Sequence, residues 1–480
     1  MAVSPARAAA FEILLKVDRE QSYASELLHS ARFAKLSSAD HGLATELVMG
    51  VLRWRSLLDR RLAGLSSQKL ERLDDEVLAA LRLGAYQLQF LSRIPARAAI
   101  FESVELVKAA RKVSAASFVN AVLRKLAASI GGSGSGVKSD VAVASVLVPS
   151  VGEVFAEIRN SPDSITLAER SAHPEWLTAR WVERFGLDAA CRICGHDQDH
   201  PTTAIHAYDE GSLEELVKAG VELSPGRLLT KARVVLWGDV THTRAFEQGR
   251  ISIQDEGSQL IALLVGRGEK ILDCCAAPGG KTALIAGRNA GSAVVAAELH
   301  PHRARLLRGL AREANIRVVA ADARQLPFSG LFDRILVDVP CSGTGTLARN
   351  PEIKWRLTIE DLEDLQARQI AILKSALARL DAGGRLVYST CSLEREENEA
   401  VVEVALAGAV EFSSAEFSSS GFSGSEFSIV DCGEELERLR QAGELCVEDI
   451  GSLLSGRYLR TIPGVHPCDG FFAAILEKKA

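Results

Sequence analysis

The stretch EKILDCCAAPGGKTALIAGR, residues 269–288, predicts a strand, a glycine-rich turn and a helix in succession. A short apolar run indicates the strand, and apolar residues at three- and four-residue spacing indicate the helix. Further segments continue this alternation toward the C-terminus: 292–316, 317–327, 332–342, 361–384 and 385–392. Strands that alternate with helices favour a mostly parallel, doubly wound sheet with helices on both faces. The sequence therefore predicts an α/β domain built around this turn.

The glycine-rich turn allows three interpretations. A phosphate-binding loop would need glycine at the position of Cys275, and a dinucleotide site would need G-x-G-x-x-G, which the stretch does not contain. A simple strand-to-helix turn also accounts for a lone Gly-Gly pair. A ligand site is favoured by Glu298, which ends the next predicted strand 25 residues after Asp273. A carboxylate there can bridge ribose hydroxyls. Asp322 ends a third strand, placed to meet an adenine amino group. A nucleoside without a phosphate requirement describes S-adenosylmethionine.

Two cysteines follow the ends of two more predicted strands. Cys341 follows the run ILVDVP, residues 335–340, and Cys391 follows LVYST, residues 386–390. Ligands bind beside the carboxyl ends of the strands in open α/β sheets. The two thiols are therefore candidates for chemistry at one edge of the sheet.

The bulk composition indicates an ordinary soluble globular protein. The chain has 480 residues, of which 47% are hydrophobic and 25% charged, and its length allows roughly three domains. Its apolar runs fall short of the roughly 18–20 residues that span a bilayer. The N-terminal MAVSPARAAAFEILLKVDRE has charges inside its apolar stretch, which indicates an amphipathic helix and not a signal peptide. Nine cysteines without a secretion signal are expected to be reduced thiols in a cytoplasmic protein.

Charge is distributed unevenly along the chain. Residues 1–140 carry 20 Lys and Arg against 14 Asp and Glu, a net charge of +6, whereas the whole chain carries −6. A solvated helical surface would account for this modest excess, which is also compatible with a nucleic-acid partner.

Changes in pattern predict four parts. Residues 1–130 show helical spacing throughout and predict an all-α bundle. Residues 131–165 form a predicted linker, because the segment that begins it is rich in Gly and Ser. Residues 166–250 alternate between helix and strand, which predicts a small α+β module. Residues 251–480 form the α/β domain, whose last strand is GFFAAILEK.

Two further features are assigned no chemistry. The repeated Glu-Phe-Ser stretch at 410–428 predicts a surface loop insertion. Cys191 and Cys194 form a C-x-x-C pair with His196 and His200 nearby, but this spacing is tighter than that of the usual zinc ligand pairs. Ordinary buried or surface thiols are the preferred interpretation, and no metal site is predicted.

Three motifs resemble those of the RNA 5-methylcytosine methyltransferases: ILDCCAAPGGKT at 271–282, DVPCSGTGTLARNPEIKW at 338–355 and YSTCSLEREENE at 388–399. The resemblance extends over residues 170–480. The helical N-terminal part resembles the NusB RNA-binding fold, and the combination is similar to the RsmB (Sun/Fmu) family of bacterial 16S ribosomal RNA methyltransferases. Two features depart from the family pattern: Glu298, where aspartate is more common, and the Glu-Phe-Ser insertion.

The resemblance implies a Rossmann-like S-adenosylmethionine-dependent methyltransferase domain, preceded by an all-α NusB-like RNA-binding bundle and a small α+β RNA-binding module. It implies S-adenosylmethionine as the cofactor, small-subunit ribosomal RNA as the partner, and neither a membrane nor a metal. The predicted cofactor site comprises Cys275, Ala276, Ala277, Pro278, Gly279, Gly280, Lys281, Glu298, Asp322 and Asp338. Within this set, Asp338 could instead accept from the cytosine amino group. Lys281 could polarise the base or simply be solvated.

Methylation at carbon 5 of cytosine explains why two thiols are needed. A thiolate that adds to carbon 6 converts the ring into an enamine, whose carbon 5 can attack a sulfonium methyl. A second acid–base group then assists loss of the carbon 5 proton and release of the enzyme. The chemistry alone permits either order of the two thiols. The resemblance implies Cys391 as the nucleophile and Cys341 as the group that assists release.

The motifs indicate an RNA base as the substrate and leave two alternative functions to consider. The target base must leave its stack, and sequence-specific readers of RNA usually take bases from loops. Arg349 and Lys354 are candidate phosphate contacts, unless they belong to a solvated loop. One rival is a transfer-RNA enzyme with the same catalytic domain, which the NusB-like bundle disfavours. The other is a non-catalytic RNA-binding or antitermination protein, which the pair Cys341 and Cys391 disfavours.

Overall fold

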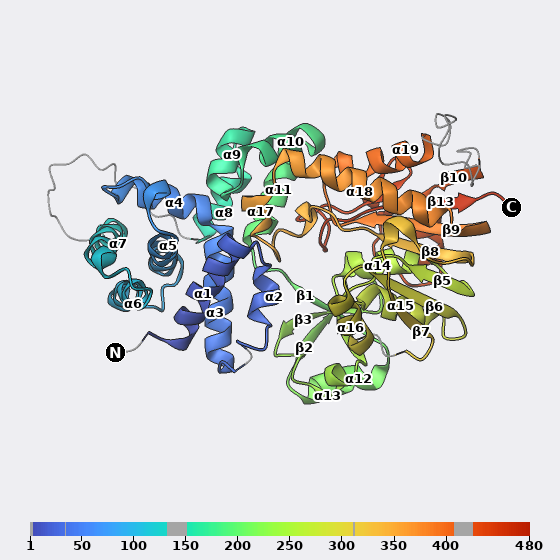
Figure 1. Ribbon diagram of the computed structural model, residues 1–480, viewed down its shortest axis with the longest axis horizontal. Helices are drawn as coiled ribbons and strands as arrows, with labels where there is room; N and C mark the ends of the chain where they lie inside the picture. Colours follow the sequence, from blue (N-terminus) through green and yellow to red (C-terminus); the bar gives the residue numbers. More distant parts are fainter. Residues whose placement is uncertain (1–2, 34, 132–150, 311–312, 408–425) are drawn as a thin grey trace. The chain divides into compact units, whose positions relative to one another are not determined.

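The computed structural model describes residues 3–33, 35–131, 151–310, 313–407 and 426–480, and these form two compact units (Figure 1). The first unit contains residues 1–200 and 347–356, and the second contains residues 201–346 and 357–480. Most of the predicted linker and of the Glu-Phe-Ser insertion, 132–150 and 408–425, lies outside the described residues.

The described part of the first unit is helical. Its helices are α1 (Pro5–Glu20), α2 (Ala24–Leu28), α3 (Ser38–Arg53), α4 (Arg55–Leu65), α5 (Asp75–Phe90), α6 (Ala96–Ala109), α7 (Ala116–Gly131), α8 (Val151–Arg159), α9 (Ser164–Ser171), α10 (Glu175–Phe185), α11 (Leu187–Gln198) and α17 (Ile353–Arg356). Helix α5 is buried along most of its length. At Gly50 of α3 an added Cβ would lie 1.9 Å from the Tyr86 ring of α5, so this glycine permits close packing of the two helices. The all-α bundle is confirmed.

Helices α10 and α11 differ from the expected grouping, because they belong to the first unit and not with the strands that follow them. Leu177, Trp181 and Cys194 are fully buried there, so the apolar faces of both helices are covered within the helical unit. The sequence pattern shows that these faces must be covered but does not show by which neighbours.

The second unit begins with a four-stranded antiparallel sheet in the order β2-β3-β1-β4. Its strands are β1 (Thr203–Ala207), β2 (Glu222–Pro225), β3 (Ala232–Trp237) and β4 (Ile251–Ile253), with helices α12 (Glu210–Lys218) and α13 (Arg244–Glu247). The alternation of strand and helix expected for this stretch is present.

The main sheet has the order β11-β12-β13-β9-β8-β5-β6-β7, with β10 paired to β13. Its strands are β5 (Lys270–Asp273), β6 (Ala293–Glu298), β7 (Ile316–Ala320), β8 (Phe332–Asp338), β9 (Leu380–Thr390), β10 (Phe427–Val430), β11 (Leu454–Ser455), β12 (Tyr458–Arg460) and β13 (Phe472–Lys478). Strands β5 to β9 pair in parallel, whereas β10 to β13 pair antiparallel. The chain runs outward from β5 to β7 and then returns to β8 on the other side of β5. Such a switch point opens a crevice at the carboxyl ends of the strands.

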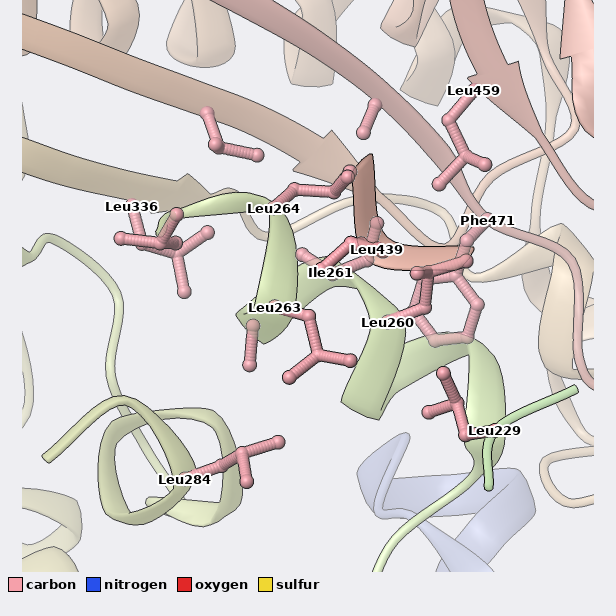
Figure 2. Packing of buried hydrophobic residues seen from close by; sticks show 14 of the residues in the cluster. Leu229, Leu260, Ile261, Leu263, Leu264, Leu284, Leu336, Leu439, Leu459 and Phe471 are labelled. Atoms are coloured by element: carbon pink, nitrogen blue, oxygen red, sulfur yellow. The ribbon is translucent and has the colours of Figure 1, made fainter. Parts of the chain in front are cut away.

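Helices cover both faces of this sheet, namely α14 (Glu256–Leu264), α15 (Gly280–Arg288), α16 (Pro301–Leu310), α18 (Ile359–Leu377), α19 (Glu399–Ala407) and α20 (Cys432–Gln441). Figure 2 shows how Leu260, Ile261 and Leu264 of α14 pack with Leu336 and Phe471 on one face. The other face is covered by α18 and α19. Alternate residues of one strand enter opposite cores, since strand side chains alternate between the faces. The predicted Rossmann-like α/β domain is confirmed, with an antiparallel C-terminal edge.

Candidate active site

The two predicted catalytic cysteines lie next to each other. Strands β8 and β9 are neighbours in parallel register, with Asp338 opposite Ser389, so the loops that follow them leave the sheet side by side. The Sγ atoms of Cys341 and Cys391 are 3.3 Å apart, although the residues are separated by 50 positions. The Gly345 amide donates to the Cys391 carbonyl at 2.9 Å, which joins the two loops. Both sulfurs can therefore reach one bound base.

An ion pair lies beside the cysteines. Lys281 Nζ is 2.8 Å from Asp338 Oδ2, and Ser389 Oγ donates to Asp338 Oδ1 at 2.7 Å. Burial opposes the charge of Lys281, but the Asp338 carboxylate outweighs it, so the pKa of Lys281 is raised; Cys391 adds to this effect. Lys281 therefore remains protonated.

Cys341 has a different electrostatic environment. The contact with Cys391 raises the pKa of Cys341 well above its usual value, and burial, Glu397 and Asp338 raise it further. Two thiols this close cannot both ionise easily, because like charges oppose each other. The charge environment therefore favours a protonated Cys341.

A cavity of about 260 Å³ lies at the start of α15. Its lining residues are Ile253, Gln254, Asp255, Ser258, Asp273, Cys275, Ala276, Ala277, Pro278, Gly279, Gly280, Lys281 and Asp338. It thus includes the entire predicted loop 275–281 and Asp338. Gly279 has a φ of 119°, which other residues rarely adopt, and it lets the chain turn directly into the helix.

Two buried acceptors in this cavity, Gln254 Oε1 and Asp273 Oδ1, have no hydrogen-bond partner among the described residues. Burial raises the pKa of Asp273 to about 7. Unpaired buried acceptors are costly, and a carboxylate favours a nearby cation. The cavity therefore suits a ligand that carries a positively charged donor. Sequence reasoning missed Gln254, whose only local signal is its position directly after the short strand β4.

Glu298 is the last residue of β6 and Asp322 follows the neighbouring strand β7, but neither lines this cavity in the part of the chain that is described. Glu298 is 5% exposed, and its Oε1 accepts from the His300 amide at 3.0 Å. Asp322 pairs with Arg324 at 2.6 Å, and this hydrogen bond lowers the pKa of Asp322.

Four acids at this edge of the sheet raise the pKa of the Cys275 thiol. The pKa of Cys275 is raised well above its usual value, first by burial and then by Asp273, Asp338, Glu298 and Asp322. The four carboxylates thus surround the glycine-rich loop, each after a different parallel strand. Cys275 is therefore a half-buried, protonated thiol that contributes to the cavity wall.

The prediction that Lys354 contacts phosphate is wrong. Lys354 is 2% exposed, and its Nζ donates to the carbonyls of Arg53 at 2.9 Å and Ala172 at 3.1 Å, all within the first unit. Burial lowers the pKa of Lys354 to about 7. Arg349, the other candidate, is partly buried.

Family models match two regions of the chain. Residues 260–477 match the model described as 16S rRNA methyltransferase RsmB/F, and residues 4–128 match the NusB family. The NusB-family match contains most of the segment Val113–Ile130. Judged only by its length and composition, this segment could cross a membrane.

Curated relatives cover most of the chain. "Probable ribosomal RNA small subunit methyltransferase B" of Bacillus subtilis is 35% identical over 419 residues, which cover 84% of this chain and 88% of the relative. Ribosomal RNA small subunit methyltransferase B of Pseudomonas syringae is 35% identical over 392 residues, covering 78% and 80% of the two chains.

Solved structures share the fold. The crystal structure of PH0851 has a TM-score of 0.73 at 21% identity and covers 99% of both chains. NSun6 from Pyrococcus horikoshii, solved with SFG, has a TM-score of 0.52 at 20% identity, covering 65% of this chain and 99% of that one. S-adenosylmethionine is the cofactor of the methyltransferase domain in the present chain. The chain belongs to the RsmB/F family of 16S ribosomal RNA methyltransferases and carries a NusB-family domain at its N-terminus.

Proposed function

We propose that this protein methylates carbon 5 of a cytosine in small-subunit ribosomal RNA through a covalent cysteine adduct. The 3.3 Å separation of Cys341 and Cys391, beside the cofactor loop, carries this proposal. Carbons 5 and 6 of the base are adjacent, so the group that attacks one and the group that deprotonates the other must be neighbours.

Cys391 is the nucleophile in this proposal. Cys391 is one of the groups that raise the pKa of Lys281, so a cation lies close to this sulfur, and a thiolate is the reactive form of cysteine. The contact with Cys391 and burial raise the pKa of Cys341, and the charges of Glu397 and Asp338 raise it further. These surroundings support the same assignment of roles that the sequence motifs imply.

The two thiols act in turn. Cys391 Sγ forms a bond to carbon 6, which makes carbon 5 nucleophilic. The charge of Cys391 disappears once this bond has formed, and with it the largest influence that raises the pKa of Cys341. Cys341 can then release its own proton to solvent, and the thiolate accepts the carbon 5 proton after the methyl group has arrived. Loss of that proton restores the ring double bond as the bond between carbon 6 and sulfur breaks.

The cavity residues fit S-adenosylmethionine, which supplies a methyl group on a sulfonium when bound. The unpaired acceptors Gln254 Oε1 and Asp273 Oδ1 would hold its ammonium group. Glu298 would bridge the ribose hydroxyls, and Asp322 would meet the adenine amino group. Asp338 is held by Lys281 and Ser389 between this cavity and the cysteines, so it can orient either ligand.

The names of the relatives, which specify the small ribosomal subunit, support the proposed substrate class. These names favour ribosomal RNA over transfer RNA as the substrate. A protein that acts on ribosomal RNA in a bacterial cell would be located in the cytoplasm. The NusB-family domain would bind the RNA without performing chemistry. Its affinity should then weaken as salt rises, because phosphate contacts release counterions.

Bisulfite sequencing tests the proposal. RNA from cells that contain or lack the protein should differ at one cytosine of the small-subunit RNA, and Cys391→Ala should not restore that mark. Methylation of purified small-subunit RNA at any atom other than carbon 5 would refute the chemistry. A mark found only in transfer RNA would refute the substrate.

A further inference from the structure

Glu397 is a fully buried carboxylate in a short turn of 3-10 helix, Arg395–Glu397, and it is surrounded by donors. Its Oε1 accepts from the Ser342 amide at 2.8 Å and from Gln369 Nε2 at 2.9 Å. Its Oε2 accepts from the hydroxyls of Ser342 and Ser392. Burial raises the pKa of Glu397, whereas the hydrogen bonds from Ser342, Ser392 and Gln369 oppose that shift and favour the ionised carboxylate.

The partners of this carboxylate are the residues that directly follow the two cysteines. Ser342 comes after Cys341, and Ser392 comes after Cys391. The two serine hydroxyls also lie 3.0 Å apart, so one carboxylate closes a ring that includes both loops. Together with the hydrogen bond from the Gly345 amide to the Cys391 carbonyl, this carboxylate therefore fixes the position of each sulfur relative to the other.

The backbone of Glu397 is fixed as well. Tyr388, which lies on β9, donates its hydroxyl to the Glu397 carbonyl at 2.6 Å. Asn398, the next residue, donates to the Ser392 carbonyl at 2.8 Å and accepts from Thr390. The carboxylate cannot move without moving the end of β9 and the Cys391 loop.

We propose that Glu397 is a positioning residue, which holds Cys341 and Cys391 at the separation needed to act on adjacent atoms of one base. This inference rests on the two-cysteine function proposed above. Glu397 does not reach the base itself; it acts through Ser342 and Ser392. Its charge also opposes early ionisation of Cys341, which keeps the two thiols in their order.

A carboxylate suits this position better than an amide. Glutamine offers one acceptor oxygen where Glu397 offers two, and its NH₂ group would face two serine hydroxyls that now donate. The loops would have to rearrange, and a displacement of about 1 Å in an active site can cost about 100-fold in rate.

The test compares Glu397→Gln with a matched control in the full-length protein. Glu403→Gln removes the same charge from α19, where the Glu403 side chain is 53% exposed and pairs with Arg395. Glu397→Gln should lower kcat about 100-fold, with the KM for RNA and the S-adenosylmethionine affinity within about threefold of the parent (an order-of-magnitude allowance). Glu403→Gln should match the parent.

The outcomes separate this inference from the function on which it rests. If Cys391→Ala is inactive and Glu397→Gln turns over like the parent, the positioning role is wrong and the two-cysteine function stands. If Cys391→Ala remains active, the function itself fails.

A second pair of variants guards against misfolding. If Glu397→Gln does not fold, Ser342→Ala and Ser392→Ala each remove one donor to the carboxylate. Each should lower kcat and leave cofactor affinity unchanged. Parent-like turnover in both would overturn the proposal.

Discussion

Replacing the two cysteines separately should stop the reaction at different stages. Cys391→Ala removes the proposed nucleophile, a sulfur whose charge interacts favourably with Lys281, so no bond to carbon 6 should form. Cys341→Ala leaves that sulfur in place, and it removes the neighbour 3.3 Å away that accepts the carbon 5 proton. A covalent protein–RNA complex should therefore accumulate with Cys341→Ala alone.

The expected magnitude follows from what Cys341 supplies. A positioned general base contributes about 10²–10⁴ in rate, which is about 2.7–5.5 kcal/mol of activation free energy. Elimination should slow by that factor. Attack by Cys391 should change little, because the ion pair between Lys281 and Asp338 is intact in this variant. The adduct should thus persist long enough to survive denaturation.

Denaturing gel electrophoresis with labelled RNA measures the complex, and a labelled methyl group shows whether transfer preceded the arrest. Cys446→Ala is the control, because Cys446 is an exposed thiol outside the site. It should behave as the parent does. An adduct with Cys391→Ala instead of Cys341→Ala would reverse the assigned roles. Full turnover by either variant would refute the mechanism.

Three further predictions concern single residues. Glu298→Ala should weaken S-adenosylmethionine binding more than about tenfold in calorimetry, since a charge-assisted hydrogen bond is worth about 1.5–3 kcal/mol; unchanged affinity would exclude the ribose role. Burial raises the pKa of Asp273 to about 7, and the cofactor cation favours the ionised carboxylate. The affinity for S-adenosylmethionine should therefore fall by up to about tenfold for each pH unit below that pKa. In Asp273→Asn the affinity for S-adenosylmethionine should not depend on pH. The pKa of Lys354 falls from 10.5 to about 7 on folding, so the unfolded chain binds more protons in that window and the free energy of unfolding should rise with pH. Denaturant titrations of Lys354→Met at pH 7 and 9 should lack this rise.

The local parts of the site could be predicted from the sequence because each is encoded by a few adjacent residues. The loop from Cys275 to Lys281 has a strand before it and a helix after it, and both elements are visible as hydrophobic periodicity. The four acids and two cysteines end strands, and the carboxyl ends of parallel strands meet at one edge. Neighbouring strands could therefore be expected to bring Cys341 and Cys391 to the same place.

The parts that escaped prediction depend on partners distant in sequence. Lys354 stands in a polar stretch that indicates a solvated loop, yet its carbonyl partners Arg53 and Ala172 are 301 and 182 residues away. Glu397 stands among other acids, and its function becomes visible only when Ser342, 55 positions earlier, lies against it. Charge and composition describe a residue's own preference, whereas burial is decided by what folds over it.

The order of the two thiols follows from their separation more than from either motif. Two thiolates 3.3 Å apart would repel strongly, so the pair holds one negative charge at a time. In the proposed mechanism Cys341 does not carry this first charge, because the contact with Cys391, burial, Glu397 and Asp338 all raise its pKa. In that mechanism, formation of the bond to carbon 6 removes the charge from Cys391. The pKa of Cys341 then falls, because its contact with Cys391 is the largest cause of the raised value. If the proposed roles hold, base catalysis by Cys341 is conditional on covalent attack by Cys391.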